Sequence, residues 1–365
     1  MSWLTSDDDD LDGPYAEYAD HRVRSRPNPK ANRPRTKRRP EHADAVIGMV
    51  TAVDRGRYTT LVPKGADPHD PTERSITAAR ARELRRTPIV IGDRVQLVGD
   101  ISGEEGSLSR IVGLEDRKTL LRRSADDSDT VERVMVANVD QMLIVIAAAN
   151  PEPRVRLVDR YLVAAYDAGI SPILCITKCD LADPEPFLAH FAGLEVPVFR
   201  SSPADWETDA PDGVLAAIRA QLEDKTTVFV GHSGVGKSTL INALVPEADR
   251  ATGHVNEVTG RGRHTSSSSV AFRMPRGGVG SSEDADVDPG WVIDTPGVRS
   301  FGLGHVTAEG ILRGFVDLAT LIDSCPRGCT HREDAPDCEL DLAIADERLD
   351  AMGALRVESL RRLLP

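Results

Sequence analysis

Long apolar runs and a secretory signal are both missing from this sequence. No uninterrupted apolar stretch approaches the roughly 18–20 residues that a helix needs to cross a bilayer, so we expect no membrane partner. The segment MSWLTSDDDD at residues 1–10 has neither the basic start nor the apolar core of a signal peptide. We therefore expect a cytoplasmic protein. In that compartment its five cysteines stay reduced, and we expect them to pack in the core or bind metal rather than form disulfide bonds.

An excess of positive charge is also missing. The formal net charge of −13 argues against a protein that coats nucleic acid with its whole surface. The charge is uneven, however: residues 1–20 hold seven Asp or Glu and no Lys or Arg, and residues 22–39 hold nine Lys or Arg and no acid. We expect residues 1–43 to be a disordered tail, because this composition cannot bury a core. Two interpretations remain open, a basic arm that contacts phosphates or a solvated tail that the acidic block neutralises.

Residues 44–115 are rich in short runs of Val, Ile, Thr and Tyr. These runs are VIGMVTAVD, YTTLV, PIVIGDRVQLVGD and GSLSRIVGL. Four or five short strands in about 70 residues predict a small barrel of OB type. Such barrels often bind oligonucleotides, but Tyr58 is the only aromatic residue between 46 and 114. Recognition of backbone or shape is therefore favoured over base stacking.

Residues 116–305 alternate between apolar strands and helical patterns. The expected strands are MLIVIAA, PILCIT, VPVF, TVFV and WVID. This alternation predicts a mostly parallel sheet with helices on both faces. Residues 306–365 are expected to be helical, with a Cys/His cluster and one charged amphipathic helix over about 340–364. The predicted fold class is thus multi-domain: an OB-type β-barrel, a central α/β domain and a C-terminal helical zinc-binding domain.

The segment GHSGVGKS at residues 231–238 has the spacing of a P-loop. It follows the predicted strand TVFV and opens a predicted helix, which is the context that a P-loop requires. Lys237 is expected to reach the β- and γ-phosphates, and the Ser238 hydroxyl is expected to bind Mg²⁺. The nucleotide-binding residues predicted here are Gly231, His232, Ser233, Gly234, Val235, Gly236, Lys237, Ser238 and Thr239.

Two further motifs complete the predicted nucleotide site. Asp294 and Gly297 belong to DTPG, which ends the strand WVID. We expect the Asp294 carboxylate to hold Mg²⁺ through water and the Gly297 N–H to reach the γ-phosphate. The motif TKCD closes the strand PILCIT, and in it Asp180 is expected to accept from the N1–H and N2–H₂ groups of guanine. The other base-site residues predicted are Thr177, Lys178, Ser201 and Ser202, the last two bringing backbone N–H to the guanine O6 atom.

The order of these motifs is unusual. The base-reading motif at 177–180 precedes the phosphate loop at 231–238, whereas ordinary GTPases have the phosphate loop first. A circular permutation gives this order, and compact domains tolerate one when their termini lie close together. The strands before residue 231 are then the second half of the same sheet.

A metal site is predicted near the C-terminus. Three cysteines and one histidine supply a full tetrahedral set for one structural zinc ion. These ligands are Cys325, Cys329, His331 and Cys338. Cys175 and Cys179 repeat the first spacing, but one is expected to pack in its strand and the other is the variable residue of TKCD, so a second metal site is not expected.

Together these motifs resemble the RsgA (YjeQ) family of circularly permuted GTPases, which are maturation factors of the small ribosomal subunit. The likeness runs from about residue 46 to the C-terminal helix and includes GDRV, RKTLLRR, ANVDQMLIVIAA and GRHTSS. It implies binding of GTP and GDP, of the 30S subunit and its rRNA, and hydrolysis of GTP that the subunit stimulates. The chain departs from the family pattern at Thr177, where Asn is common, and in its metal spacing, where C-x₄-C-x-H-x₅-C is typical.

We expect hydrolysis of GTP by this chain to be slow unless a group outside the DxxG motif orients the attacking water. Many GTPases place a water-orienting Gln after the glycine of DxxG, and here Val298 has that position. The resemblance points to His264 as the residue that orients the water and to Thr265 as the second protein ligand of Mg²⁺, although His264 folding the switch or contacting RNA stays open. The expected function is a GTPase of late small-subunit maturation, acting as a monomer. The alternative is a GTP-sensing RNA-binding switch with a non-ribosomal target and little hydrolysis.

Overall fold

A computed structural model describes residues 42, 44–124, 132–207, 210–248, 269–276, 287–295 and 306–364. The tail predicted for residues 1–43 lies outside the described residues, apart from His42.

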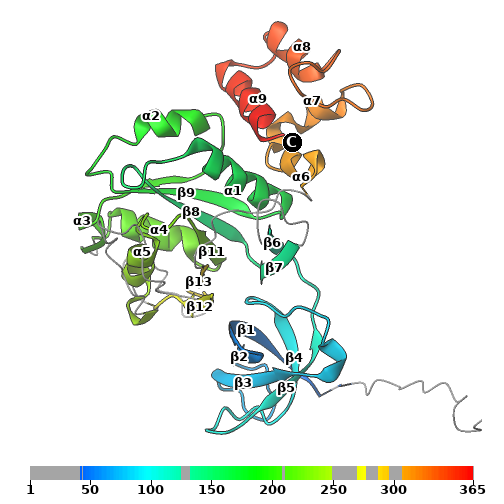
Figure 1. Cartoon of the computed structure of the whole chain (residues 1–365), viewed down its shortest axis with the longest axis vertical. Helices are drawn as coiled ribbons and strands as arrows, with labels where there is room; N and C mark the ends of the chain where they lie inside the picture. The colour runs from blue at the N-terminus through cyan, green and yellow to red at the C-terminus, as the bar shows by residue number, and fades with distance from the viewer. Residues whose placement is uncertain are drawn as a thin grey trace, which may run out of the picture. The chain divides into compact units, whose positions relative to one another are not determined.

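The first part of the described chain is a closed five-stranded barrel (Figure 1). Its strands are β1 (Val46–Asp54), β2 (Arg57–Val62), β3 (Arg74–Arg80), β4 (Arg94–Gly99) and β5 (Ser109–Leu114). They pair in the order β1-β2-β3-β5-β4, and β4 returns to β1 to close the barrel. Alternate side chains point inward, so that Val50, Val95 and Ile111 are fully buried. The predicted OB-type barrel is confirmed, although its third strand, RSITAAR, was not among the expected runs.

The second part is a mostly parallel sheet. Its strands are β8 (Gln141–Ala147), β9 (Ser171–Thr177), β10 (Val198–Arg200), β11 (Thr226–Val230), β12 (Val270–Arg273) and β13 (Trp291–Asp294). The order across the sheet is β10-β9-β8-β11-β13-β12, with β12 antiparallel to its neighbour and the others parallel. Strands β8, β9 and β10, which precede β11 and the P-loop in sequence, therefore complete the sheet on one side of β11. This confirms the predicted circular permutation.

Helices cover both faces of this sheet (Figure 1). Along β8, Met142 and Ile144 join the core under α1 (Val155–Asp167), while Leu143 and Val145 join the core under the helices of the opposite face. Burial on both faces explains why this strand is a continuous apolar run. The helices of the opposite face are α4 (Val214–Leu222) and α5 (Lys237–Leu244). The shorter elements are α2 (Glu185–Leu188), α3 (Ala204–Glu207) and the hairpin of β6 (Leu120–Ser124) and β7 (Glu132–Ala137).

The C-terminal part is helical, as predicted, but its last helix is divided. The structure has α6 (Ala308–Leu312), α7 (Ala319–Asp323), α8 (Glu339–Ala345) and α9 (Ala351–Leu363). The single helix expected over about 340–364 is therefore wrong. The break follows from local chemistry, because Glu347 has a positive φ of 56° and Asp350 accepts a hydrogen bond from the Gly353 N–H at 2.7 Å to start a new helix. Within the described ranges, every helix is too short or too polar to cross a membrane.

Candidate nucleotide and metal sites

The phosphate loop joins β11 to α5 and depends on glycine. Gly231, Gly234 and Gly236 all have positive φ, at 152°, 83° and 94°. A Cβ atom on Gly231 would lie 2.4 Å from the Val145 carbonyl oxygen, so no larger residue fits there. Gly236 precedes the first residue of α5, Lys237. The sequence thus folds into the strand–loop–helix arrangement whose backbone N–H groups bind phosphates.

Lys237 and Asp294 meet at the same edge of the sheet. Strand β13 runs parallel to β11 with Asp294 beside Phe229, which brings the start of the DTPG motif next to the P-loop. The Lys237 ammonium forms an ion pair with the Asp294 carboxylate, and the two side chains are 11% and 2% exposed. The neighbouring Thr295 donates to the Phe229 carbonyl at 2.7 Å and fixes this strand end. The two charges that the sequence assigns to phosphate and to Mg²⁺ therefore lie in contact and neutralise each other.

The guanine motif is tied to the phosphate loop through two side chains. Thr177 is completely buried, and its hydroxyl donates to the Val235 carbonyl at 2.5 Å, with the Ile146 carbonyl 3.2 Å away. Lys178 has a positive φ of 57°, and its ammonium donates to the Gly234 carbonyl at 2.8 Å. Burial lowers the pKa of Lys178, while the nearby Asp180 carboxylate acts to raise it. These hydrogen bonds connect the guanine motif to the phosphate loop, although the two lie far apart in sequence. The Thr177 hydroxyl supports the loop through the Val235 carbonyl.

The remaining base-site residues lie at the ends of β9 and β10. Asp180 is exposed in the turn after β9. Ser201 is buried in the sheet ladder, where its N–H donates to the Ile176 carbonyl at 2.8 Å. The Ser202 N–H donates instead to the carboxylate of Asp205 at 2.6 Å. The sequence prediction missed Asp205, although the spacing Ser-x-x-Asp is a signature of a helix start.

The rest of the phosphate loop differs in exposure. Val235 is buried, Ser238 is half-buried, and His232, Ser233 and Thr239 are exposed. The His232 ring nitrogen Nδ1 lies 3.0 Å from the Ser233 carbonyl oxygen.

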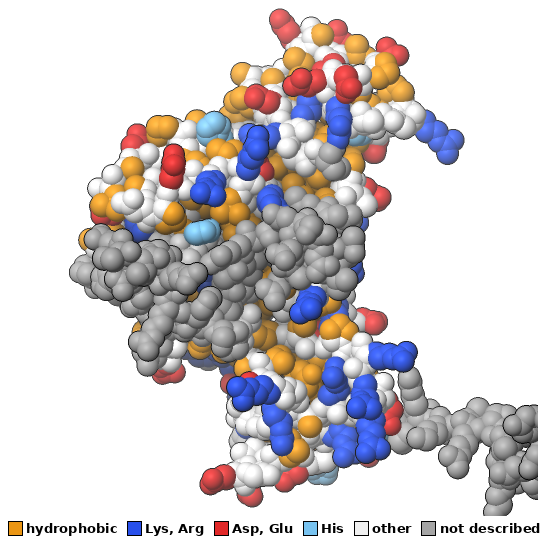
Figure 2. All heavy atoms as spheres, viewed as in Figure 1, with side chains coloured by type: hydrophobic (Ala, Val, Ile, Leu, Met, Phe, Trp, Pro, Cys, Tyr) orange, Lys and Arg blue, Asp and Glu red, His pale blue; other side chains and the backbone are white. Residues whose placement is uncertain are grey.

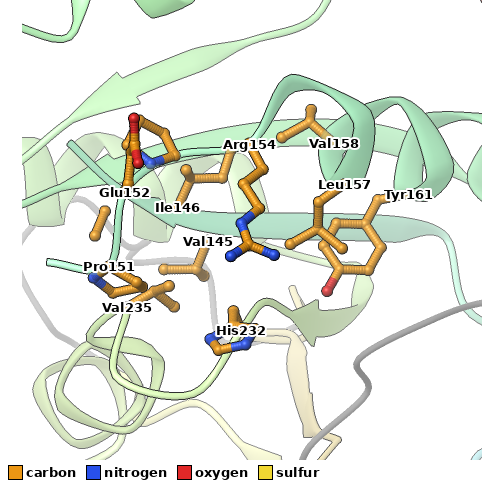
Figure 3. A pocket seen from close by; sticks show the side chains of 12 residues that line it. Val145, Ile146, Pro151, Glu152, Arg154, Leu157, Val158, Tyr161, His232 and Val235 are labelled. Atoms are coloured by element: carbon orange, nitrogen blue, oxygen red, sulfur yellow. The ribbon is translucent and has the colours of Figure 1, made fainter. Parts of the chain in front are cut away.

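A mostly apolar pocket lies on one flank of this loop, between the end of β8 and the start of α1. Figure 3 shows the Arg154 guanidinium pointing toward His232 across this pocket, with Tyr161 beside them. The residues of the guanine motif do not line it. The pocket is thus separate from the predicted base site, and nothing in the sequence pattern had indicated it.

His264, Thr265, Gly297 and Val298 lie outside the described residues. The predictions made for them therefore stay predictions.

The four predicted metal ligands converge. The ligand atoms of Cys325, Cys329, His331 and Cys338 all lie within 4.8 Å of one another. Ligands of one tetrahedral zinc ion stand roughly 3.8 Å apart, so the cluster fits such an ion with small adjustments. Burial raises the pKa of the Cys325 thiol to about 11 and lowers that of His331. The altered spacing is thus no obstacle to a shared site.

The backbone of the metal cluster has one support that sequence reasoning missed. The guanidinium of Arg361, on α9, donates to the His331 carbonyl at 3.1 Å and pairs with Asp341 at 2.7 Å. A second cluster of this kind does not occur among the residues that the structure describes. Cys175 is fully buried, and burial raises its pKa to about 12, which fits the packing role expected for it.

Known proteins resemble this chain in sequence and in fold. The family model for the RsgA GTPase matches residues 114–304. The "Small ribosomal subunit biogenesis GTPase RsgA" of Pseudomonas syringae pv. tomato is 38% identical over 284 residues, covering 76% of this chain and 75% of that protein. The protein of the same name from Pseudomonas fluorescens SBW25 is 37% identical over 285 residues, covering 76% of this chain and 75% of that protein.

Two solved structures share the fold. YjeQ from Thermotoga maritima superposes with a TM-score of 0.59 at 22% identity, covering 88% of this chain and 99% of that one. YloQ, described as a circularly permuted GTPase, gives a TM-score of 0.55 at 23% identity, covering 89% and 97% of the two chains. At these identities the likeness is one of architecture, and it agrees with the strand order found here.

Proposed function

The chain belongs to the RsgA GTPase family, and from that premise we propose that it hydrolyses GTP to GDP and phosphate on the small (30S) ribosomal subunit during late maturation. One observation carries the proposal for the reaction. The guanine motif, the phosphate loop and Asp294 meet at one edge of the sheet although their order in sequence is permuted. Ligands bind at this edge in open α/β folds.

Nucleotide binding would separate the ion pair at the phosphate loop. Lys237 pairs with one carboxylate in the structure, and a triphosphate would offer it more negative charge than that carboxylate does. Asp294, once released, would hold Mg²⁺ through water together with the Ser238 hydroxyl and Thr265. When bound, Mg²⁺ supplies neutralisation of the charge that develops between the β- and γ-phosphates. Lys237 would thus exchange Asp294 for phosphate, and Asp294 would exchange Lys237 for the Mg²⁺ shell. This exchange supports the site, because each of the two buried charges keeps a charge of opposite sign beside it.

The water-activating group is assigned to His264. Family resemblance supports this role, and Val298 has no polar group to orient a water. Phosphoryl transfer depends mostly on positioning and electrostatics, so a histidine that the ribosome fixes in place would account for stimulation by the subunit. His232 is less suited to orient the water, because it is exposed and its ring nitrogen Nδ1 lies beside the Ser233 carbonyl oxygen of the same loop.

We assign one structural zinc ion to the Cys₃His cluster. Three thiolates and one imidazole use all four tetrahedral positions, which leaves none for a substrate. The ion would fix the segment between α7 and α8, which carries all four ligands.

The RNA-facing surface is proposed to lie on the barrel. Figure 2 shows Lys and Arg side chains gathered over the barrel. Exposed arginines of β3, of the turn after it and of β5 stand close in the fold, since β3 and β5 are paired. They are Arg80, Arg82, Arg85, Arg86 and Arg110. Such a patch supplies phosphate contacts in spite of the acidic total charge. We further propose a monomer that works in the cytoplasm.

The non-ribosomal alternative is not favoured, because the relatives are named for small-subunit biogenesis. Sedimentation with purified subunits tests the partner. We expect the protein to sediment with small subunits in a non-hydrolysable GTP analogue and to be released in GDP, while large subunits retain little of it. Retention that ignores both the subunit and the nucleotide would contradict the proposal.

A further inference from the structure

The segment after β10 forms a small hydrogen-bonded cap. The N–H and the hydroxyl of Ser202 both donate to Oδ2 of Asp205, at 2.6 and 2.8 Å. The Asp205 N–H donates back to the Ser202 carbonyl at 3.1 Å. Pro203 directly precedes Ala204, the first residue of α3, where its fixed φ is tolerated. The Asp205 carboxylate, from inside this four-residue helix, thus reaches back to Ser202 in the manner of a capping box.

This cap uses the backbone donor that the base site needs. Within Ser201–Pro203, the first N–H belongs to the sheet ladder, where it donates to the Ile176 carbonyl at 2.8 Å. Pro203 has no N–H to offer. Within this segment the N–H of Ser202 is left to meet the guanine O6 atom, and the Asp205 carboxylate accepts from that same N–H.

We propose that Asp205 is an affinity-determining residue that competes with the O6 atom of guanine for the Ser202 N–H. This inference rests on the base site of the proposed function. The carboxylate oxygen and O6 are both acceptors, and the carboxylate is negatively charged, so the two cannot share this position at short range. Guanine enters when Asp205 leaves, and the return of Asp205 helps guanine to leave. The residue thus weakens binding of GTP and GDP and speeds their release.

Helix α3 has packing contacts besides the hydrogen bonds between Ser202 and Asp205. Trp206, the next residue of α3, packs against the phosphate loop, with its ring 3.2 Å from where a Cβ of Gly236 would lie. Helix α3 also packs against α4 and α5 (Figure 1). Asp205 itself is exposed, so we expect α3 to keep its position when the cap opens.

Calorimetric titration of the full chain with GDP, IDP and ADP tests the proposal. GDP and IDP both present an O6 acceptor, whereas ADP presents an amino group at that position. In Asp205→Ala we expect GDP and IDP to bind about fivefold more tightly, the factor that corresponds to a typical helix cap. ADP binding should not change. Asp205→Asn should give a smaller gain, since its amide oxygen still accepts but is uncharged.

A matched control removes another capping aspartate. Asp350 caps α9 in the C-terminal module, and Asp350→Ala should leave binding of all three nucleotides unchanged. If GDP affinity is unchanged or lower in Asp205→Ala while the native protein still prefers GDP to ADP, the competition is refuted and the base site stands. If the native protein binds GDP and ADP equally, both ideas fail. Should Asp205→Ala not fold, the absence of any gain for GDP in Asp205→Asn refutes the proposal by itself.

Discussion

Replacing Thr177 by valine isolates the hydrogen bond that fastens the guanine motif to the phosphate loop. The two side chains have nearly the same shape, so no cavity forms at this fully buried position. The substitution removes the donor that the Val235 carbonyl meets at 2.5 Å. A buried acceptor left without its donor costs about 1–3 kcal/mol. We therefore expect the free energy of unfolding to fall by about 1–2 kcal/mol, measured by urea denaturation without nucleotide.

The same change should weaken nucleotide binding. Val235 lies inside the loop whose N–H groups bind phosphates, and a loop that must be ordered on binding loses affinity. A loss of about 1.4 kcal/mol corresponds to about tenfold in the Kd for GDP, measured by titration calorimetry.

Thr227→Val is the matched control. This threonine is equally buried, and its hydroxyl donates to the Gln141 side chain at 3.2 Å at the far end of β11 from the loop. It should lose similar stability and keep its GDP affinity. If both variants bind GDP like the native protein, the Thr177 hydroxyl does not order the phosphate loop for nucleotide binding.

Three other substitutions probe the sites independently. Gly231→Ala places a Cβ 2.4 Å from the Val145 carbonyl and should raise the Kd for GDP more than tenfold in calorimetry; near-native affinity would show that the loop opens freely. Asp180→Asn should lower the preference for GTP over ATP by at least about tenfold in a competition assay, because one charged acceptor is lost; an unchanged preference would place base recognition elsewhere. Arg361→Gln removes the support of the His331 carbonyl and should weaken zinc binding by about tenfold in chelator competition, with the more exposed Arg348→Gln as control. Equal zinc affinity in both would assign Arg361 a packing role only.

Much of the fold was predictable because it follows from strong local patterns. The continuous apolar run of β8 required burial on both faces, and the P-loop glycines required their special backbone angles. Strand β3 was missed because RSITAAR, rich in alanine and arginine, resembles a helix more than a strand. It is a strand because Ile76 and Ala78 fill the barrel, a tertiary effect that composition does not reveal.

The convergence of the metal ligands was predictable from the sequence, whereas the contacts around the guanine motif were not. The metal ligands converge in spite of their altered spacing, since turns such as the one at Gly328, with its φ of 85°, adjust the path of the loop. The inward orientation of Thr177 depends on the distance between two strand ends, which no motif specifies. The Ser-x-x-Asp spacing indicates the hydrogen bond between the Ser202 N–H and the Asp205 carboxylate. The effect of that bond on nucleotide affinity depends on where the base binds, which the spacing does not specify.

Phosphate release from GTP should be followed with and without purified small ribosomal subunits. We predict slow turnover by the protein alone, a rise of orders of magnitude with small subunits, little effect of large subunits, and no activity in Lys237→Ala. A rate that is unchanged by small subunits would contradict the proposal that this chain is a ribosome-stimulated GTPase.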